Sequence, residues 1–508
     1  MPRPKPKSDF GFDPKYLEGA TWRCAGLPVE HVETHAAHIF LCSDLAYKIK
    51  KPVRYSYLDF STLEKRRQIL HQELELNKRF APSLYKQVIE VLGEPALVMR
   101  RFAASALLSN IVLHTKLDEA ICTQLAEMVA KSHTMVAASN AKGGDIMLGL
   151  SKQLENTFRA NPKLFPKTVE NGLSQRFQEL VESLWALLNV RSSKGLVRHC
   201  HGDMHCENII IENGMPTLFD AVEFNERIAT VDVLYDLAFL LMDLIRFDQR
   251  KAANTVLNTY LDLRRNEEDL SGLAALPLFL ATRAGVRALV AADRLSGMAK
   301  AGAASYQVKS RLYFEACARY VAKTRPTLVC IGGLSGSGKS TVAKQLAHLV
   351  GAAPGALLVR SDVERKHIAG VSVRCHISPA YYTVAASRIV YHEIMARARS
   401  ALSAGHSVIL DAVFAEEGQR VLAEALARQT GASFLGLWLD APLDKLKRRV
   451  TGRVGDASDA TPNVVDVQHH LSLGHINWRR IDASGTLQHT IDNVQRAFEQ
   501  QDPAYHVA

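Results

Sequence analysis

Residues 327–341 read Thr-Leu-Val-Cys-Ile-Gly-Gly-Leu-Ser-Gly-Ser-Gly-Lys-Ser-Thr. An apolar run opens this stretch and predicts a buried strand, and the apolar spacing of residues 342–349 predicts a helix directly after it. The glycines between them allow backbone N–H groups to close around phosphate oxygens, and the N-terminus of the helix adds partial positive charge. The stretch satisfies the pattern G-x-x-x-x-G-K-[S/T] in full, so it predicts a phosphate-binding loop on an α/β sheet.

This loop supplies most of the nucleotide contacts expected in the C-terminal third of the chain. Lys339 is expected to reach the β- and γ-phosphates, which makes it a catalytic as well as a binding residue, and Ser340 is expected to ligate Mg²⁺. The residues expected to bind the nucleotide are Gly333, Ser335, Gly336, Ser337, Gly338, Lys339, Ser340 and Thr341. The alternative is a glycine-rich turn that carries a lysine by chance, and the strand and helix on either side argue against it.

Two carboxylates follow predicted strands beyond the loop. Strand-like runs alternate there with helical segments, which predicts a parallel sheet, at residues 357–360, 408–410 and 434–439. Ligands bind at the carboxyl ends of strands in such sheets. Asp411 is therefore expected beside the loop as a metal ligand, and Asp362 is expected to accept the proton of an acceptor hydroxyl. Arg365 would hold an anionic group of that acceptor, although Asp362 could instead simply cap the next helix.

A basic helix end at residues 448–453 runs into a polar loop. Arginines in such a flap can neutralise charge on a transferring phosphoryl group, and a solvated charged helix is the alternative. Together with the phosphate loop, these features make residues 327 to about 500 similar to small P-loop kinases of the gluconate kinase, zeta-toxin and polynucleotide kinase kind. The resemblance implies that Asp362 is a general base and that Arg449 and Arg453 are catalytic lid arginines.

A second motif lies at residues 201–208, which read His-Gly-Asp-Met-His-Cys-Glu-Asn. It has the H-x-D-x-x-x-x-N spacing of a kinase catalytic loop. Two apolar runs follow it, joined by an Asn-Gly hairpin signal, and the second run ends at Asp220. A hairpin brings its two ends together, so Asp203 would accept a hydroxyl proton while Asn208 and Asp220 would hold Mg²⁺.

Such a site also requires a lysine on an upstream strand to hold the α- and β-phosphates. The run at residues 45–50 offers Lys48, which we prefer, and Lys50 as the second choice. A glutamate on the amphipathic helix predicted at residues 63–80 should pair with it, and Glu73 is preferred. The other candidates for this partner are Glu64 and Glu75. The glycine-rich loop of protein kinases is missing from the preceding segment.

These residues make the stretch from residue 31 to about 320 similar to the aminoglycoside phosphotransferase family. The family motif and its later metal aspartate match at His201, Asp203, Asn208 and Asp220, and Asp232 and Asp236 look like its structural acids. With the P-loop segment attached, the whole chain resembles bacterial proteins described as bifunctional aminoglycoside phosphotransferase-like/ATP-binding. The resemblance does not identify the substrate, because relatives phosphorylate aminoglycosides, choline, homoserine and sugar-like compounds.

The expected architecture is an α+β bilobal protein-kinase-like domain followed by an α/β P-loop domain with a parallel sheet. The expected boundaries are a tail at residues 1–30, a kinase-like domain at 31–322 and a P-loop domain at 327–508. Within the kinase-like domain, an N-lobe is expected at about 31–103 and a helical C-lobe at about 104–322. Residues 322–326 are the expected linker between the two domains, because they end at Pro326 and a helix does not readily continue into the residue before a proline.

Composition narrows the partners and the compartment. The 508 residues carry a net charge of +10, which attracts anions, but the basic residues form no single-sign block and nucleic-acid binding is not favoured. Eight cysteines without a C-x-x-C pair predict reduced thiols in a cytoplasmic protein, and the His/Cys cluster at residues 199–206 lacks zinc spacing. The apolar stretches 231–245 and 273–292 contain charged residues, so both are expected to be buried helices and not membrane spans.

The sequence therefore predicts an ATP- and Mg²⁺-dependent phosphotransferase with two ATP sites. Each site would transfer the γ-phosphoryl group to an alcohol hydroxyl of a small metabolite of the aminoglycoside-like, sugar or sugar-acid type. Two alternatives stay open. The chain could be an ATP-sensing regulatory protein with one or no active site, or its C-terminal domain could be a polynucleotide 5′-kinase. The oligomeric state and the identity of the acceptors are not predicted.

Overall fold

The computed structural model describes residues 29–34, 36–54, 59–223, 225–295, 300–452 and 457–501. The chain folds into two compact units. The first comprises Met1–Gly149 and Leu188–Phe247, and the second comprises Leu150–Leu187 and Asp248–Ala508. Helices α5 (Gly143–Ala160) and α6 (Lys167–Ser193) cross from one unit to the other. The boundary expected at residues 322–327 stays a prediction, and almost all of the expected tail lies outside the described residues.

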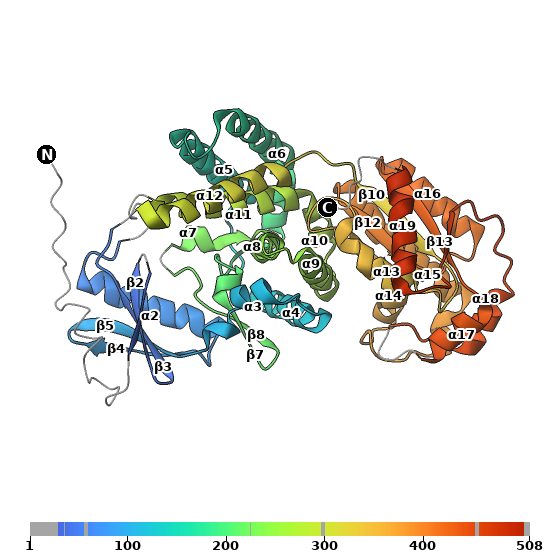
Figure 1. The fold of residues 1–508 in the computed structure, drawn as a ribbon, viewed down its shortest axis with the longest axis horizontal. Coiled ribbons are helices and arrows are strands. Elements are labelled where there is room, and N and C mark those ends of the chain that lie inside the picture. Colours follow the sequence, from blue (N-terminus) through green and yellow to red (C-terminus); the bar gives the residue numbers. More distant parts are fainter. Residues whose placement is uncertain are drawn as a thin grey trace. The chain divides into compact units, whose positions relative to one another are not determined.

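The first unit begins with an antiparallel five-stranded sheet in the order β1-β2-β3-β5-β4 (Figure 1). Its elements are β1 (Glu30–Glu33), β2 (Ala37–Cys42), β3 (Leu45–Lys50), α2 (Leu63–Phe80), β4 (Tyr85–Val91) and β5 (Glu94–Arg100). Thr62 caps the N-terminus of α2 by accepting a hydrogen bond from the Lys65 N–H. Leu70 of α2 is buried in a cluster with Leu97 of β5, so one face of the helix packs on the sheet.

The rest of the first unit is mainly helical. Its further elements are η1 (Ala104–Ala106), α3 (Leu108–His114), α4 (Glu119–Met135), β6 (Val197–His199), η2 (Cys206–Asn208), β7 (Ile209–Glu212), β8 (Met215–Leu218), α7 (Glu226–Ala229), β9 (Thr230–Asp232) and α8 (Val233–Arg246). Strands β7 and β8 form the expected hairpin, with Asn213 and Gly214 at positive φ in its turn. Helix α8 is buried along most of its length, as expected for the apolar stretch that contains it.

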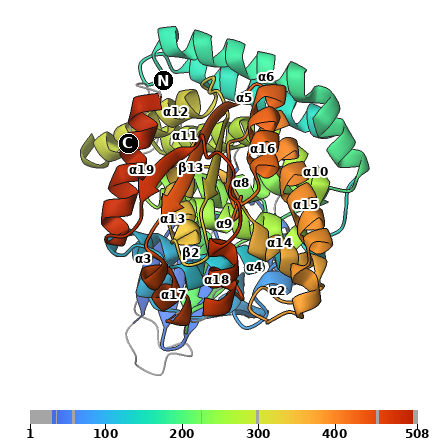
Figure 2. The ribbon, with the colours of Figure 1, turned by 90° about the vertical axis from the view of Figure 1, so that its right-hand side faces the viewer.

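The second unit contains a parallel five-stranded sheet in the order β11-β12-β10-β13-β14. Its elements are β10 (Thr327–Gly332), α13 (Lys339–Leu346), η4 (Ala347–Leu349), β11 (Leu357–Arg360), α14 (Ser361–Ile368), η5 (Pro379–Tyr382), α15 (Val384–Ser403), β12 (Val408–Asp411), α16 (Glu417–Thr430), β13 (Ser433–Asp440), α17 (Leu443–Thr451), α18 (Pro462–His469), β14 (Arg479–Asp482) and α19 (Leu487–Gln501). Residues of α13 and α19 share one buried cluster with the sheet, and α15 and α16 lie against its other side (Figure 2). The predicted fold class is confirmed in both parts.

Four further helical segments precede this sheet in the second unit. They are α9 (Arg250–Arg264), α10 (Glu267–Gly272), α11 (Leu276–Leu295) and α12 (Lys300–Tyr320), with η3 (Leu273–Ala275) between α10 and α11. Among the described residues, the stretch Glu267–Leu295 is the one helix long and apolar enough to cross a membrane, and 72% of its most apolar window is buried inside the protein. Its burial agrees with the expectation of a core helix.

The cysteines of the described residues are mostly free thiols. Free thiols are found at Cys122, Cys200, Cys206, Cys317, Cys330 and Cys375. Cys42 at the end of β2 is instead disulfide-bonded, so the expectation that all eight cysteines are reduced is wrong at this position. Counting cysteines and inspecting their spacing cannot reveal a pair that only the folded chain brings together.

Candidate functional site

Two carboxylates of helix α8 accept hydrogen bonds from the loop at residues 201–208. The Gly202 N–H donates to Asp236 Oδ1 at 3.0 Å, and the Cys206 N–H donates to Asp243 Oδ2 at 3.0 Å. Both carboxylates are buried. Gly202 has a φ of 81°, and a Cβ there would approach the backbone of Ala229 to 3.2 Å. The loop is therefore held at two backbone positions by carboxylates of one buried helix.

The structure brings Asp203 and Asn208 together. The Asn208 Nδ2 donates to the backbone oxygen of Asp203 at 2.9 Å and to its Oδ2 at 3.0 Å. His205 Nε2 lies 3.2 Å from the same carboxylate oxygen. The side chain of Asp203 is 38% exposed, so a substrate hydroxyl can reach it, while His205 is buried. The amide and imidazole thus orient a carboxylate that still faces solvent.

Lys48 joins this loop to the antiparallel sheet. Its Nζ lies 2.7 Å from Glu73 Oε1 on α2 and 2.6 Å from Asp220 Oδ1 after β8. Lys50 also reaches Glu73, through Oε2 at 2.7 Å, and its Nζ lies 2.7 Å from Glu223. Both candidate lysines therefore contact the preferred glutamate, and Lys48 also contacts Asp220.

Burial and charge oppose each other in this cluster. Burial favours the neutral form of Lys48, but the carboxylates of Asp220 and Glu73 outweigh it and raise the pKa of Lys48 well above its usual value. Burial likewise acts to raise the pKa of Glu73, but the two ammonium groups lower it to about 2. For Glu223 burial prevails over the attraction of Lys50 and raises the pKa. Glu73 is thus firmly ionised, whereas Glu223 binds a proton more readily.

Three residues around Asp220 were not expected from the sequence, namely Asn77, Tyr85 and Glu223. Asp220 has a φ of 62°, an uncommon conformation for a residue with a side chain. The Asp220 N–H donates to Tyr85 Oη at 3.0 Å, and the next N–H along the chain donates to Asn77 Oδ1 at 2.8 Å. These bonds hold the strained turn. Glu223 could have been found from its position three residues after Asp220, but nothing local to Asn77 or Tyr85 indicated their role.

A buried group of metal-ligating residue types also lies under this loop, formed by His133, Cys200 and Asp236. Their polar atoms already have protein partners. His133 Nε2 lies 3.4 Å from Asp236 Oδ2, Asp236 Oδ1 accepts from Gly202, and the Cys200 thiol points to the Val231 oxygen at 3.6 Å. The group is consistent with a hydrogen-bonded support of the loop.

The phosphate loop in the second unit is shaped by its glycines. Gly333 and Gly336 have φ values of 136° and 85°, and a Cβ at these positions would lie 2.5 Å from the Leu439 oxygen and 2.4 Å from the Leu446 oxygen. The loop therefore packs on β13 and α17 without room for side chains. The Ser337 hydroxyl is buried without a hydrogen-bond partner. This orphaned donor and the close-packed cradle fit a phosphate-binding role.

Asp362 and Asp411 lie at the carboxyl ends of neighbouring strands. Arg360 and Asp411 are paired in register, and the Arg360 Nε lies 3.3 Å from Asp411 Oδ2. Burial and the negative charge of Asp411 raise the pKa of Asp362, while Arg360 and Lys339 act in the opposite direction. The N-cap of α14 is Arg360 without a side-chain cap, so capping does not account for Asp362.

Arg365 and Lys366 of α14 both contact protein groups. The guanidinium of Arg365 donates to the Tyr381 oxygen at 2.5 Å and lies 4.8 Å from the centre of the Tyr382 ring. Lys366 Nζ lies 2.8 Å from Asp459, which also accepts from the Tyr382 hydroxyl at 2.9 Å. The expectation that Arg365 holds an anionic group stays a prediction.

The lid role expected of Arg449 and Arg453 stays a prediction. Arg449 Nη2 donates to the Ala483 oxygen at 2.8 Å, and its Nη1 lies 3.5 Å from the Gly336 oxygen, so this arginine holds backbone beside the loop. Arg453 lies outside the described residues. Gln468 of α18 accepts from the Ser335 N–H at 2.8 Å, a contact for which the sequence carries no signal.

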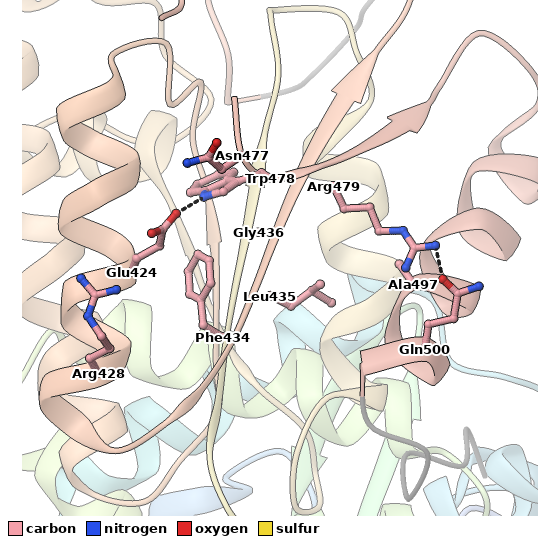
Figure 3. A pocket seen from close by; sticks show the side chains of 10 residues that line it. All are labelled: Glu424, Arg428, Phe434, Leu435, Gly436, Asn477, Trp478, Arg479, Ala497 and Gln500. Carbon is pink, nitrogen blue, oxygen red and sulfur yellow. Dashed lines mark hydrogen bonds between the residues drawn. The ribbon is translucent and has the colours of Figure 1, made fainter. Parts of the chain in front are cut away.

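A cavity of about 550 Å³ lies on the second unit away from this loop (Figure 3). It is lined by Glu424, Arg428, Phe434, Leu435, Gly436, Asn477, Trp478, Arg479, Ala497 and Gln500. The lining uses the first residues of β13 and β14, whereas the phosphate loop follows the last residue of β10. In register, Phe434, Leu435 and Gly436 of β13 pair with Leu328, Val329 and Cys330 of β10, so this part of the lining lies before the end of β10 that leads into the phosphate loop.

Two family models match the chain. Residues 62–275 match the family described as phosphotransferase enzyme family, and residues 328–471 match the family described as AAA domain. The chain thus joins a segment that matches a phosphotransferase family model to a segment that matches an AAA-domain family model. Proteins of Mycobacterium tuberculosis strain H37Rv and Mycobacterium bovis, both described as uncharacterized, are 28% identical to it over 477 residues, which cover 90% of this chain and 93% of each relative.

Solved structures resemble this chain over one part each. A choline/ethanolamine kinase family protein from Mesorhizobium loti is 15% identical, with a TM-score of 0.38, and covers 60% of this chain and 97% of its own. A gluconokinase from Sinorhizobium meliloti is 17% identical, with a TM-score of 0.27, and covers 36% of this chain and 98% of its own.

Proposed function

We propose that this protein is a phosphotransferase with two ATP- and Mg²⁺-dependent sites, each of which transfers the γ-phosphoryl group to an alcohol hydroxyl of a small metabolite. One observation carries the proposal. Each site combines a lysine, a carboxylate suited to a metal ion and a second carboxylate suited to a hydroxyl proton, drawn from residues far apart in the sequence. Phosphoryl transfer requires positioning and charge neutralisation, and these groups supply both.

In the first unit, Lys48 would hold nucleotide phosphates while Glu73 keeps its ammonium group in place. Asn208 and Asp220 would supply oxygen ligands of the kind that suit Mg²⁺, which would neutralise charge on the transferring group when bound. Asp203 would accept the proton of the acceptor hydroxyl. Its exposure and its two hydrogen-bonding neighbours support this role.

In the second unit, Lys339 and the backbone N–H groups of the phosphate loop would hold the nucleotide, and Ser340 and Asp411 would hold the metal ion. Asp362 would accept the proton of the second acceptor. Its raised pKa makes it a stronger base than an ordinary aspartate, which supports this role. The second acceptor would be a small hydroxyl compound of the sugar or sugar-acid type and not a nucleic acid, and the reaction would take place in the cytoplasm.

The test is product formation by the full chain with Mg-ATP and a bacterial metabolite extract, followed by phosphorus NMR and mass spectrometry. Asp203→Asn and Lys339→Ala should each abolish a different phosphorylated product. The matched controls Asp145→Asn and Lys152→Ala change exposed residues and should retain both products. If neither active-site variant changes any product while ATP still binds, the chain is a regulatory nucleotide-binding protein and the proposal is wrong.

A further inference from the structure

Helix α9 covers the free edge of the parallel sheet in the second unit. Strand β11 is the outer strand, so one side of its backbone has no neighbouring strand. The side chain of Asn258 serves that side as a strand would, because its Oδ1 accepts from the Leu358 N–H at 2.7 Å and its Nδ2 donates to the Ala356 oxygen at 3.2 Å. Asn254 donates to the same oxygen at 3.0 Å. Two amides therefore fix the edge strand in register with the helix.

The C-terminal end of α9 also contacts α14, the helix that follows β11. Arg265, the C-cap of α9, directs both terminal nitrogens at the carboxylate of Glu364, at 3.2 and 2.5 Å. Arg397 of α15 lies 3.0 Å from Glu364 and 3.2 Å from Asp262. Glu364 is almost completely buried, and removing one partner of a buried ion pair leaves the other charge uncompensated, so these two contacts hold Glu364 in place.

Strand β11 ends at Arg360 and α14 begins at Ser361, so no loop separates the edge strand from the turn that carries Asp362. The middle of α14 contacts three different parts of the unit through consecutive residues. Glu364 contacts α9 and α15, Arg365 contacts the segment at Tyr381, and Lys366 contacts Asp459, which precedes α18. A shift of this short helix would move Asp362 and both cations together.

We propose that Arg265 is a positioning residue for the P-loop site, acting through Glu364 to hold α14 and thus the carboxylate of Asp362. This inference rests on the proposed function of that site. Helix α9 belongs to the segment matched by the phosphotransferase family model, so the P-loop site uses a part of the chain outside its own family match. Small displacements of a catalytic group cost about 10- to 100-fold in rate, which sets the expected effect.

The experiment uses the full chain with Arg265→Met, the conservative Arg265→Lys and the matched control Arg264→Met. Arg264 is the adjacent arginine and pairs with Asp269 of α10 at 2.6 Å, not with α14. Hydrogen exchange of the amides of residues 357–368 measures directly how firmly β11 and α14 are held. The rate of Mg-ATP hydrolysis, with water as the acceptor, measures the activity of the P-loop site. The part of this rate that is lost in Lys339→Ala is the contribution of the P-loop site, called the P-loop share below.

For Arg265→Met we expect faster exchange in residues 357–368, about a 10- to 100-fold fall in the kcat of the P-loop share, and a KM for ATP within about twofold. Arg265→Lys should recover part of the kcat. In Glu364→Gln the further change to Met at position 265 should have little effect, because both act through one contact. Exchange and kcat no different from Arg264→Met would overturn the proposal.

A second pattern would also overturn it. If kcat, the KM for ATP, the melting temperature and the product of the first unit all change together, Arg265 only stabilises the fold. If Lys339→Ala leaves ATP hydrolysis unchanged, the proposed function of the P-loop site is wrong, while the exchange measurement still decides whether Arg265 holds α14.

Discussion

Replacing Glu73 by glutamine should destabilise the first unit by roughly 3 kcal/mol. The carboxylate lies between two ammonium groups at 2.7 Å each, with none of its side chain exposed. Its pKa falls from 4.5 to about 2, and each pKa unit is worth about 1.4 kcal/mol, which gives roughly 3 kcal/mol for the ionised form. Breaking a buried ion pair by removing one partner costs about 3–5 kcal/mol, so two independent approaches agree.

The cost should be moderated by the partners that remain. Lys48 keeps Asp220 at 2.6 Å, and Lys50 keeps Glu223 at 2.7 Å, so neither ammonium group is left alone. The measurement is hydrogen exchange of the amides in β3 and α2 as a function of urea, which reports the stability of the first unit separately from the second. Glu75→Gln on the same helix changes an exposed residue and is the matched control.

The pH dependence of this difference has a definite sign. The folded-state pKa of Glu73 is lowered, so its contribution is fully present above about pH 4.5 and is lost as the pH falls toward 2. The difference between wild type and Glu73→Gln should therefore be constant from about pH 6 to 8. A loss below about 1 kcal/mol, or one equal to that of Glu75→Gln, would show that the buried carboxylate is not held by the two lysines.

Three further predictions concern the reacting groups. Because burial and Asp411 raise the pKa of Asp362, the kcat/KM for the P-loop product should fall as the pH drops through a pKa above that of an ordinary aspartate. Asp362→Asn should lower the rate by about 100-fold or more and should abolish this acidic fall in kcat/KM. If the variant keeps the same acidic fall, Asp362 is not the base. Lys48→Met should raise the KM for ATP at the first site more than Lys50→Met does, since Lys48 also contacts the predicted metal aspartate, and equal effects in steady-state kinetics would contradict this order. Gly336→Ala should reduce calorimetric Mg-ATP binding from two sites to one, because its Cβ would lie 2.4 Å from a carbonyl of α17, and two intact sites would refute it.

The sequence predicts those parts of the fold and site that depend on local patterns. The run of glycines before Lys339 and the Asn-Gly turn between β7 and β8 each determine their own geometry through backbone conformations that other residues adopt with difficulty. The amphipathic spacing of residues 63–80 indicated α2 with its observed ends. The required chemistry predicted a glutamate on this helix as the partner of the strand lysine, whereas the preference for Glu73 over Glu64 and Glu75 rested on no local signal and is matched by the contact at 2.7 Å.

Contacts between distant elements could not be predicted in this way. Asn258 and Leu358 are 100 residues apart, and Arg265 and Glu364 are 99 apart. Nothing in the sequence near an asparagine on a helix surface shows that it will meet the edge of a strand. The same holds for Gln468 at the phosphate loop. Such residues are specified by how the elements pack, and packing depends on the whole core.

The two sites reach a similar set of chemical groups by different physical means. The first site relies on charge, because Lys48 and Lys50 stand among three carboxylates and the cluster has a net charge of −1 when all are ionised. A surplus of negative charge favours a divalent cation, and the raised pKa of Glu223 gives the cluster a way to reduce that surplus when no cation is bound. The P-loop site relies instead on backbone shape and on the position of α14. Substitutions should therefore affect the first site mainly through ionisation and the second mainly through geometry.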